Sequence, residues 1–339
     1  MKNIVRAMGF IVCFLCFWYL FFFVLSCPYS DDYTGGFSEK MSIFKTQGTQ
    51  VVLGSWKKPA SGQKIFLLGA SDVGTSFNPD VLKRLFPHYA VFNLLGGSAN
   101  VTYMQDAFNI AQIMEQSLKG SYVIVGIWYG SFCADNKRWP QGMTDVRGAA
   151  LRYGLYKFDG NRIELVIDRK WMPWAVSLLR PFLFCEGILG EASGKYEDFW
   201  DFVRNGFKAN ILNNPNASDQ KYRQAAINAY AGRFGHVDEF SFDEQGRKLK
   251  ELCQAILASG AKLIVVDMPL PQWHRDGSVV NQQYVVKKSQ YIGEILKLPG
   301  VKYLDFSSQL PDSYFVDGVH STEAGAWQMS GKLSEVINN

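Results

Sequence analysis

Ser71, Asp317 and His320 are the residues whose types and spacing could perform acyl-group chemistry. A serine hydroxyl becomes a good nucleophile when an adjacent base takes its proton, and histidine serves as that base when a carboxylate orients it. The segment "DGVH" places Asp317 and His320 three residues apart, so the carboxylate can hold one imidazole nitrogen while the other faces a serine. Ser71 directly follows the apolar run in "KIFLLGAS". We therefore expect Ser71 at the end of a strand, with His320 and Asp317 as its base and orienting acid.

Three further residues are candidates for stabilising an oxyanion or binding substrate: Gly97, Asn100 and Tyr129. They lie in "GGSAN" and "YGSF", each of which follows an apolar run. Gly97 has no side chain, so its backbone N–H can approach a substrate oxygen closely. Taken alone, each of these motifs is more often a turn or a helix cap. Their joint order along the chain is what favours catalysis.

Five apolar runs predict the strands that must position these residues, and longer amphipathic segments between them predict helices. The expected strands are Lys64–Gly69, Tyr89–Leu95, Ser121–Trp128, Ala261–Met268 and Val301–Phe306. The expected helices are Pro79–Leu85, Met104–Leu118, Asp243–Ala258, Gln282–Leu296 and Glu323–Ile337. This alternation indicates a three-layer α/β/α fold with a central parallel sheet. Ligands bind beyond the carboxyl ends of such strands, which is where all the polar clusters fall.

The alternation fails at about residues 135–242, which we interpret as an insertion or cap. Within it, "RYGLYKFDGNRIELVI" predicts a β-hairpin that turns at "DGN". Trp171 and Trp174 follow in a segment flanked by Lys170 and Arg180. Such a segment suits a membrane interface or a groove on a membrane partner. A lid packed over the sheet is an equal alternative.

The N-terminal segment predicts a membrane anchor. Residues 7–26 are apolar and uncharged, and about 20 such residues cross a bilayer as one helix. Lys2 and Arg6 precede them, which places the N-terminus in the cytoplasm and the rest outside. We expect an anchor at residues 1–27, a stalk at 28–63 and one domain at 64–339. A cleaved signal peptide and a lipoprotein processed at Cys27 are the alternatives.

Composition excludes other classes of function. The 35 Lys and Arg against 31 Asp and Glu give a net charge of +4 without long basic runs, so we expect no nucleic-acid partner. The four histidines and six cysteines show no metal-ligand spacing, so we expect no metal and no cofactor. Outside the N-terminal segment, Cys133, Cys185 and Cys253 allow at most one disulfide.

The order of the motifs resembles the SGNH, or GDSL-like, superfamily of hydrolases and acyltransferases, from Lys64 to the C-terminus. The resemblance implies that Ser71 is the nucleophile, that Gly97 helps to form the oxyanion hole, and that Asp317 and His320 complete the triad. Two departures stand out: "GAS" replaces Gly-Asp-Ser, and Trp128 lies where an oxyanion Asn often stands. Asn100 or Tyr129 is then the expected substitute. An α/β-hydrolase fits less well, because its elbow is Gly-x-Ser-x-Gly.

Within that superfamily the chain looks like the membrane-anchored proteins of D-alanyl transfer and of alginate and cellulose O-acetylation. The resemblance implies an extracytoplasmic serine acyltransferase at the bacterial inner membrane, acting on a cell-envelope or secreted polysaccharide. It also implies a multispanning membrane O-acyltransferase as partner. Two alternatives stay open: a carbohydrate esterase or deacetylase with the same triad, and a non-catalytic adaptor that binds polymer or partner.

Overall fold

A five-stranded parallel sheet forms the centre of the molecule. The computed structural model describes residues 2–27, 46–56, 62–115, 117–139, 143–159, 162–192, 219–234 and 239–338. The strands lie in the order β2-β1-β3-β6-β7, and all neighbours are parallel. Their bounds are β1 Gln63–Leu68, β2 Tyr89–Asn93, β3 Tyr122–Ile127, β6 Lys262–Asp267 and β7 Val301–Asp305. The five predicted strands are therefore confirmed, with ends that differ by one or two residues.

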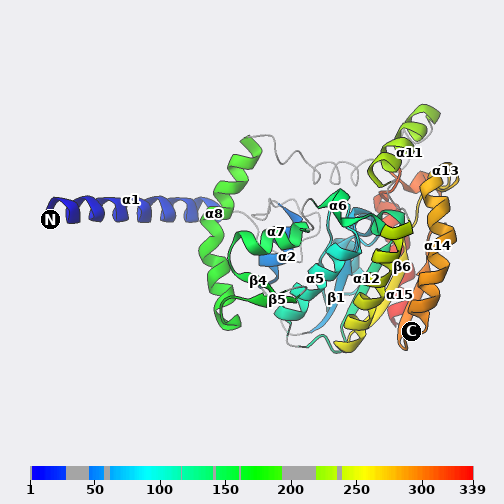
Figure 1. The fold of residues 1–339 in the computed structure, drawn as a ribbon, viewed down its shortest axis with the longest axis horizontal. Coiled ribbons are helices and arrows are strands. Elements are labelled where there is room, and N and C mark those ends of the chain that lie inside the picture. Colours follow the sequence, from blue (N-terminus) through cyan, green and yellow to red (C-terminus); the bar gives the residue numbers. More distant parts are fainter. Residues whose placement is uncertain are drawn as a thin grey trace.

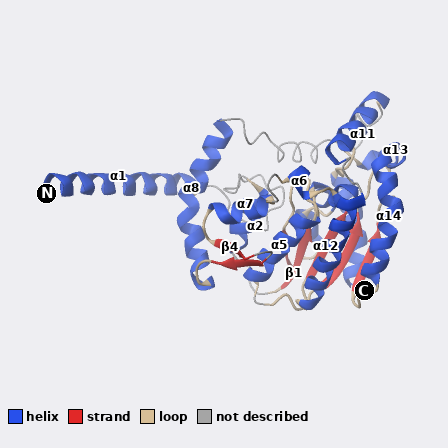
Figure 2. Ribbon diagram, viewed as in Figure 1, coloured by secondary structure: helices blue, strands red, loops and turns tan. Residues whose placement is uncertain are grey.

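Helices cover both faces of this sheet, which confirms the three-layer α/β/α fold (Figures 1 and 2). One layer consists of α5 (Val101–Met114), α12 (Glu239–Ala258) and α14 (Val279–Leu296). The other layer consists of α3 (Ser71–Ser76), α4 (Pro79–Leu85) and α15 (Glu323–Asn338). The chain changes layers after β2, and β3 then pairs with the other side of β1. The strand order therefore reverses between β1 and β3, and α/β proteins bind ligands beyond the carboxyl ends of the strands at such a reversal.

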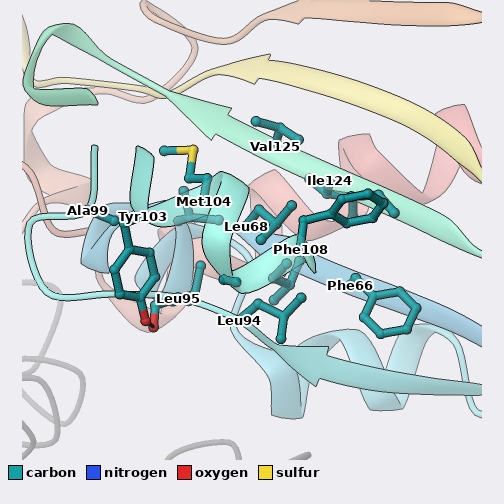
Figure 3. Close-up of a cluster of buried hydrophobic side chains, with 14 of the residues drawn as sticks. Phe66, Leu68, Leu94, Leu95, Ala99, Tyr103, Met104, Phe108, Ile124 and Val125 are labelled. Carbon is teal, nitrogen blue, oxygen red and sulfur yellow. Dashed lines mark hydrogen bonds between the residues drawn. The ribbon is translucent and has the colours of Figure 1, made fainter. Parts of the chain in front are cut away.

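Apolar side chains fill the space between the layers. Every residue of β3 is buried, as expected for a parallel strand that is covered on both faces. Met104 and Phe108 of α5 lie among the side chains of β1 and β3, including Leu68 and Val125 (Figure 3). Full burial of such a side chain is worth about 1.5–3 kcal/mol. This packing fixes the strand ends that carry the functional residues.

The predicted stalk is wrong over residues 46–56, which are part of the folded domain. They form α2 (Gln47–Leu53) and the short 3₁₀ helix η1 (Gly54–Trp56). Thr46 caps α2 by accepting a hydrogen bond from the N–H of Thr49. The apolar residues of "VVLGSW" are buried in the core, and Trp56 Nε1 donates to Tyr156 Oη at 2.7 Å. The segment "VVLGSW" is long enough to form an amphipathic turn whose apolar side the core can bury. The rest of the predicted stalk, residues 28–45 and 57–61, lies outside the described residues.

The insertion contains helices on both sides of a small hairpin. Its elements are α6 Asp135–Arg138, α7 Asp145–Arg152, β4 Tyr156–Asp159, β5 Arg162–Leu165, η4 Arg169–Trp171, α8 Met172–Ala192 and α11 Gln220–Phe234. Strands β4 and β5 pair antiparallel, which confirms the hairpin, although its turn residues 160 and 161 are not described. Helix α8 lies toward the N-terminal helix, whereas α11 packs on α13 (Gln272–Gly277) at the far side of the domain (Figure 1).

The N-terminal helix α1 (Lys2–Ser26) extends away from the domain and contacts it through α8 (Figure 1). Two described segments are long and apolar enough to cross a membrane, Lys2–Ser26 and Arg169–Leu189. None of the most apolar residues of the first segment is buried, whereas a third of those in the second are. The first segment therefore has the character of a membrane anchor or signal sequence, as the sequence predicts.

Candidate active site

Ser71 lies where β1 turns directly into α3. Gly69 has a φ of +148°, and a Cβ there would lie 2.3 Å from Val73 Cγ2. A Cβ on Gly126 of β3 would lie 2.2 Å from the same methyl group. Both positions must therefore lack a side chain for Val73 to pack inward and for the strand to turn at once into the helix. The turn leaves Ser71 half-buried at the carboxyl end of β1.

Asp317 and His320 lie on one loop just before α15. The loop is closed by an antiparallel bridge between Phe315 and Ser321. Asp317 Oδ1 accepts hydrogen bonds from the backbone N–H groups of Val319 and His320, both at 2.8 Å. Asp317 Oδ2 lies 2.7 Å from His320 Nδ1. The carboxylate thus organises the loop backbone and the imidazole together.

The structure brings Ser71 within hydrogen-bond distance of this pair, because His320 Nε2 lies 2.8 Å from Ser71 Oγ. A carboxylate can only accept, so Nδ1 of a neutral His320 carries the hydrogen and donates to Asp317. Nε2 then has a free lone pair and accepts from the Ser71 hydroxyl. This tautomer is the one that a general base requires, and the order Ser–His–Asp is that of a catalytic triad.

Charges in the pair favour the ionised forms. Burial acts to raise the pKa of Asp317, but the charge of His320 and the hydrogen bonds from His320 and Val319 outweigh it and lower that pKa. Burial acts to lower the pKa of His320, and the Asp317 carboxylate, with a smaller contribution from Asp72, outweighs it and raises that pKa. The site is therefore built to stabilise an imidazolium, which is the state that forms when His320 takes the serine proton.

Gly97, the predicted oxyanion donor, is engaged within the protein. Its backbone N–H donates to the side-chain Oε1 of Gln47, at the start of α2. The Gly97 N–H therefore has an acceptor within the protein in this structure. The role of Gly97 stays a prediction, and sequence reasoning missed Gln47 because its segment was assigned to the stalk.

Asn100 makes structural hydrogen bonds here, and its predicted role in binding an oxyanion or substrate stays a prediction. Its Oδ1 caps α5 by accepting from the N–H of Tyr103 at 3.1 Å. Its Nδ2 donates to the carbonyl of Cys133 at 3.1 Å and to Asp135 Oδ1 at 2.7 Å. Both amide hydrogens are thereby used, so neither can bind a substrate oxygen in this structure. Asn100 instead joins α5 to the first residues of the insertion.

Tyr129 supports the loop of Asp317 through a second histidine, which its hydroxyl contacts, and its role as an oxyanion donor stays a prediction. His274 is fully buried, and its Nδ1 lies 2.6 Å from the carbonyl oxygen of Gly318. Since that oxygen can only accept, His274 Nδ1 donates, and Nε2 accepts from the Tyr129 hydroxyl at 2.8 Å. Burial lowers the pKa of His274 to about 4, so it stays neutral at pH 7. Its only signal in the sequence is its place in "PLPQWH" after a predicted strand.

Trp128, where the resemblance leads one to expect an oxyanion Asn, belongs to an aromatic cluster. Its ring lies 4.6 Å from that of Tyr129, 4.9 Å from Phe234 and 6.2 Å from Tyr230, measured between centroids. Its Nε1–H is buried and has no hydrogen-bond partner among the described residues. Helix α11 of the insertion therefore packs on the end of β3, next to the candidate site. Among the described residues no group of His, Cys, Asp and Glu could hold a metal ion.

No family model and no curated protein matches the chain. Two solved structures match it at low similarity. A Bacteroides fragilis protein, provisionally described as an acylhydrolase, is 11% identical with a TM-score of 0.41, over 85% of this chain and 93% of that one. A carbohydrate esterase family 2 enzyme from Corynascus thermopiles (Myceliophthora fergusii) is 8% identical with a TM-score of 0.37, over 83% of this chain and 67% of that one. These likenesses are too distant to assign an activity, which has to be inferred from the site itself.

Proposed function

We propose that this chain is a membrane-anchored serine acyltransferase that acylates polysaccharide hydroxyls outside the cytoplasm, through an acyl-Ser71 intermediate. The observation that supports it most is the continuous set of hydrogen bonds from Ser71 Oγ through His320 to Asp317. In this arrangement the nucleophile, base and orienting carboxylate each have the required partner.

In the first half-reaction Ser71 Oγ attacks the acyl carbonyl carbon while His320 Nε2 takes the hydroxyl proton. The imidazolium that forms is stabilised by Asp317, whose two backbone hydrogen bonds keep its carboxylate in place. When the tetrahedral intermediate collapses, His320 returns the proton to the leaving group. The acyl group then forms an ester with Ser71.

The oxyanion of that intermediate needs hydrogen-bond donors. The resemblance gives this role to Gly97, whose N–H donates to Gln47 Oε1 in the structure. Substrate binding then requires the carbonyl oxygen of Gln47 to give way to the substrate oxygen. The exchange replaces one acceptor by another, so its cost is the reorganisation of one side chain.

In the second half-reaction an acceptor hydroxyl loses its proton to His320 and attacks the carbonyl carbon of the acyl-serine. The ester bond to Ser71 Oγ then breaks, and His320 returns the proton to Ser71. A sugar hydroxyl as acceptor gives transfer, whereas water gives hydrolysis by the same residues. We favour transfer to an envelope polymer because helix α1 has the length and composition of an anchor and because the motifs resemble the O-acetylation proteins. A multispanning membrane O-acyltransferase is the proposed source of the acyl group.

The test uses the full chain in detergent micelles, with p-nitrophenyl acetate as acyl donor. We expect release of p-nitrophenol and an acetyl group on the peptide that contains Ser71, detected by mass spectrometry after acid quenching. Adding alginate or cellulose oligosaccharides should divert the acetyl group from water to the sugar. Free acetate as the sole product with every acceptor would reduce the function to that of an esterase.

Two variants control the experiment. Ser71→Ala should abolish both the adduct and the turnover. Ser289→Ala removes the hydroxyl of an exposed serine on α14 that bonds only to the carbonyl of Val286, and it should leave both unchanged. If the Ser71→Ala protein still acylates acceptors, the proposed intermediate is wrong. If the native protein forms no adduct with acetyl or D-alanyl donors, the adaptor alternative replaces the enzyme.

A further inference from the structure

Helix α8 exposes an apolar stripe along one side. Trp171, just before the helix, and Trp174, Leu178, Phe182 and Leu189 within it are 56%, 67%, 47%, 62% and 69% exposed. They follow one another at intervals of three, four, four and seven residues, and at 3.6 residues per turn they share one face. Soluble proteins rarely expose so many large apolar side chains together. The exposure persists although α1 packs on the same helix.

The opposite side of α8 holds it firmly to the domain. Met172, Val176 and Leu183 are buried in the core. The carboxylate of Glu186 accepts hydrogen bonds from Arg152 and from Tyr153, at 2.5 and 3.0 Å. Although α8 is long and apolar enough to cross a membrane, these contacts tie its residues 172–186 to the domain. It therefore lies on the domain surface with its apolar stripe outward.

The contacts between α8 and α1 place that stripe relative to the proposed membrane. Tyr19 Oη donates to the carbonyl of Leu178 at 3.1 Å, and Arg180 donates to the carbonyl of Ser26 at 2.6 Å. Helix α8 runs across the end of α1 (Figure 1). Tyr19 precedes Ser26 by seven residues, which corresponds to about 10 Å along a helix. If residues 7–26 span the hydrocarbon layer, α8 lies within its outermost 10 Å or at its surface.

We propose that α8 is an in-plane membrane helix, whose stripe of Trp171, Trp174, Leu178, Phe182 and Leu189 inserts among the phospholipids of the membrane that α1 spans. Interfacial helices bury their apolar face about 5–10 Å deep at the boundary between headgroups and acyl chains, which agrees with this depth. Tryptophans prefer that boundary. Lys170 lies in η4, directly before α8; its side chain is 68% exposed and pairs with Asp168 at 3.4 Å, so its ammonium group is at the surface, where lipid phosphates can reach it.

The occupant follows from the continuity of the surface. Tyr19 of α1 lies 6.2 Å from Phe182 of α8, ring centroid to ring centroid, and Phe22 lies 6.5 Å from Phe184. The apolar surface of α1 thus meets the exposed stripe of α8 at the contact between Tyr19 and Phe182, and Phe182 is 62% exposed. The medium that surrounds the apolar surface of α1 therefore also surrounds the apolar stripe of α8. A groove on a protein partner would need to cover both helices, whereas a bilayer does so by extending around them.

The test reconstitutes the full chain in vesicles of phosphatidylethanolamine and phosphatidylglycerol that carry a photoactivatable diazirine on an acyl chain. After irradiation and tryptic digestion, we expect lipid adducts on the peptide that contains Trp171 and Trp174 as well as on α1. The peptide that contains Val285 and Val286 is the matched control, because these side chains on α14 are 48% and 76% exposed but lie far from α1 (Figure 1). Lipid adducts on α1 but none on α8 would overturn the proposal, because α8 would then be out of contact with the acyl chains.

A pair of variants separates lipid contact from folding. Trp171→Gln with Trp174→Gln should lower the labelling of α8 severalfold while labelling of α1 and turnover of p-nitrophenyl acetate stay unchanged. Val285→Gln with Val286→Gln on α14 should leave the labelling of α8 as it is. Equal labelling of α8 in the tryptophan variant and the native chain would also contradict the proposal, since these side chains then make no lipid contact.

Discussion

Ser76 Oγ lies 2.8 Å from Ser321 Oγ in the buried space between α3 and the loop that precedes α15. Next to it, the N–H of Ser321 donates to Thr75 Oγ1 at 3.2 Å. These bonds join the helix that begins at Ser71 to the residue that follows His320. The candidate nucleophile and base are therefore held together by contacts other than their own.

This relationship predicts coupling between Ser76 and Ser321 in stability. Either Ser76→Ala or Ser321→Ala leaves one buried hydroxyl without its partner, at a cost of about 1–3 kcal/mol. The double variant removes both groups and should cost less than the sum of the single changes. Urea unfolding of the four proteins measures the coupling. Strict additivity would show that the two hydroxyls do not interact.

The triad predicts strongly non-additive losses of activity. Ser71→Ala and His320→Ala should each lower kcat by roughly 10⁴- to 10⁶-fold, and the double variant should lose little more, because neither residue works without the other. Asp317→Asn should retain more activity, since the nucleophile and base remain. Initial rates with p-nitrophenyl acetate check this. Multiplicative losses in the double variant would contradict a shared role.

The raised pKa of His320 predicts the pH profile. As the base it must be neutral, so kcat/KM should fall as the pH drops through an inflection above its ordinary value of 6.5. Asp317→Asn removes the largest cause of the raised pKa and should move the inflection downward. The free energy of unfolding depends on pH in the opposite direction to kcat/KM. The stability that protonated His320 contributes is complete below pH 6.5 and is lost as the pH rises through its raised pKa. An inflection unaffected by Asp317→Asn would exclude His320 as the titrating group.

His274 is predicted to act as a positioning residue for the loop of Asp317. His274→Asn keeps a donor near the position of Nδ1, for the carbonyl of Gly318, and loses the bond to Tyr129, which should cost about fivefold in kcat for one hydrogen bond. His274→Gln places its amide near the position of Nε2 and loses the hydrogen bond to the carbonyl of Gly318. The loop of Asp317 then shifts, which should lower kcat by roughly 10- to 100-fold. KM should change little in both. If both variants lose kcat equally, and only as much as their folded fraction falls, His274 has a purely structural role.

His274 also predicts a loss of stability in acid. Its pKa in the fold is about 4, below the ordinary 6.5, so the unfolded chain binds the proton first as the pH falls. Stability should decline between pH 6.5 and 4, by at most about 3 kcal/mol from this group. Subtracting the pH dependence of the His274→Asn protein isolates the effect. Parallel stability curves for the two proteins would show that His274 does not titrate as its burial implies.

Gln47 predicts a gain of function. If Gly97 is the oxyanion donor, Gln47→Ala frees its N–H, and kcat/KM should rise by about 2- to 10-fold, the worth of one neutral hydrogen bond. Gln47→Glu keeps an acceptor at the same distance and should not show the gain. Steady-state kinetics of the two variants check this. A loss of activity in Gln47→Ala would assign Gln47 a supporting role at Gly97.

The sheet could be predicted because its strands are buried on both faces. In "YVIVGI" of β3 every side chain is buried, so an unbroken apolar run is what the position requires. The same reasoning placed Ser71 and the loop of Asp317 and His320 at one edge, since parallel strands end together. Their contact then depended on only one further condition, the docking of α15 beside α3.

The short helices and their polar partners could not be predicted in this way. Helix α3 reads "SDVGTS", too short for an apolar period, and it forms because Gly69 permits the turn and α15 covers it. Asn100 meets its partner Asp135 across 35 residues. Gln47 meets Gly97 across 50 residues. Such pairings arise from tertiary packing, and no local pattern encodes them.

The separation of Ser71 from His320 by 249 residues also determines how long after Ser71 the ribosome adds His320. At a synthesis rate of about 5–20 residues per second, the ribosome needs roughly 12–50 s to proceed from one to the other. Until then the serine is an ordinary alcohol, because neither its proton acceptor nor α15 has been made. Under the proposed mechanism, a nascent chain that ends before His320 therefore cannot form the acyl-Ser71 intermediate. Reactivity begins only after the last strand and the following loop have joined the sheet.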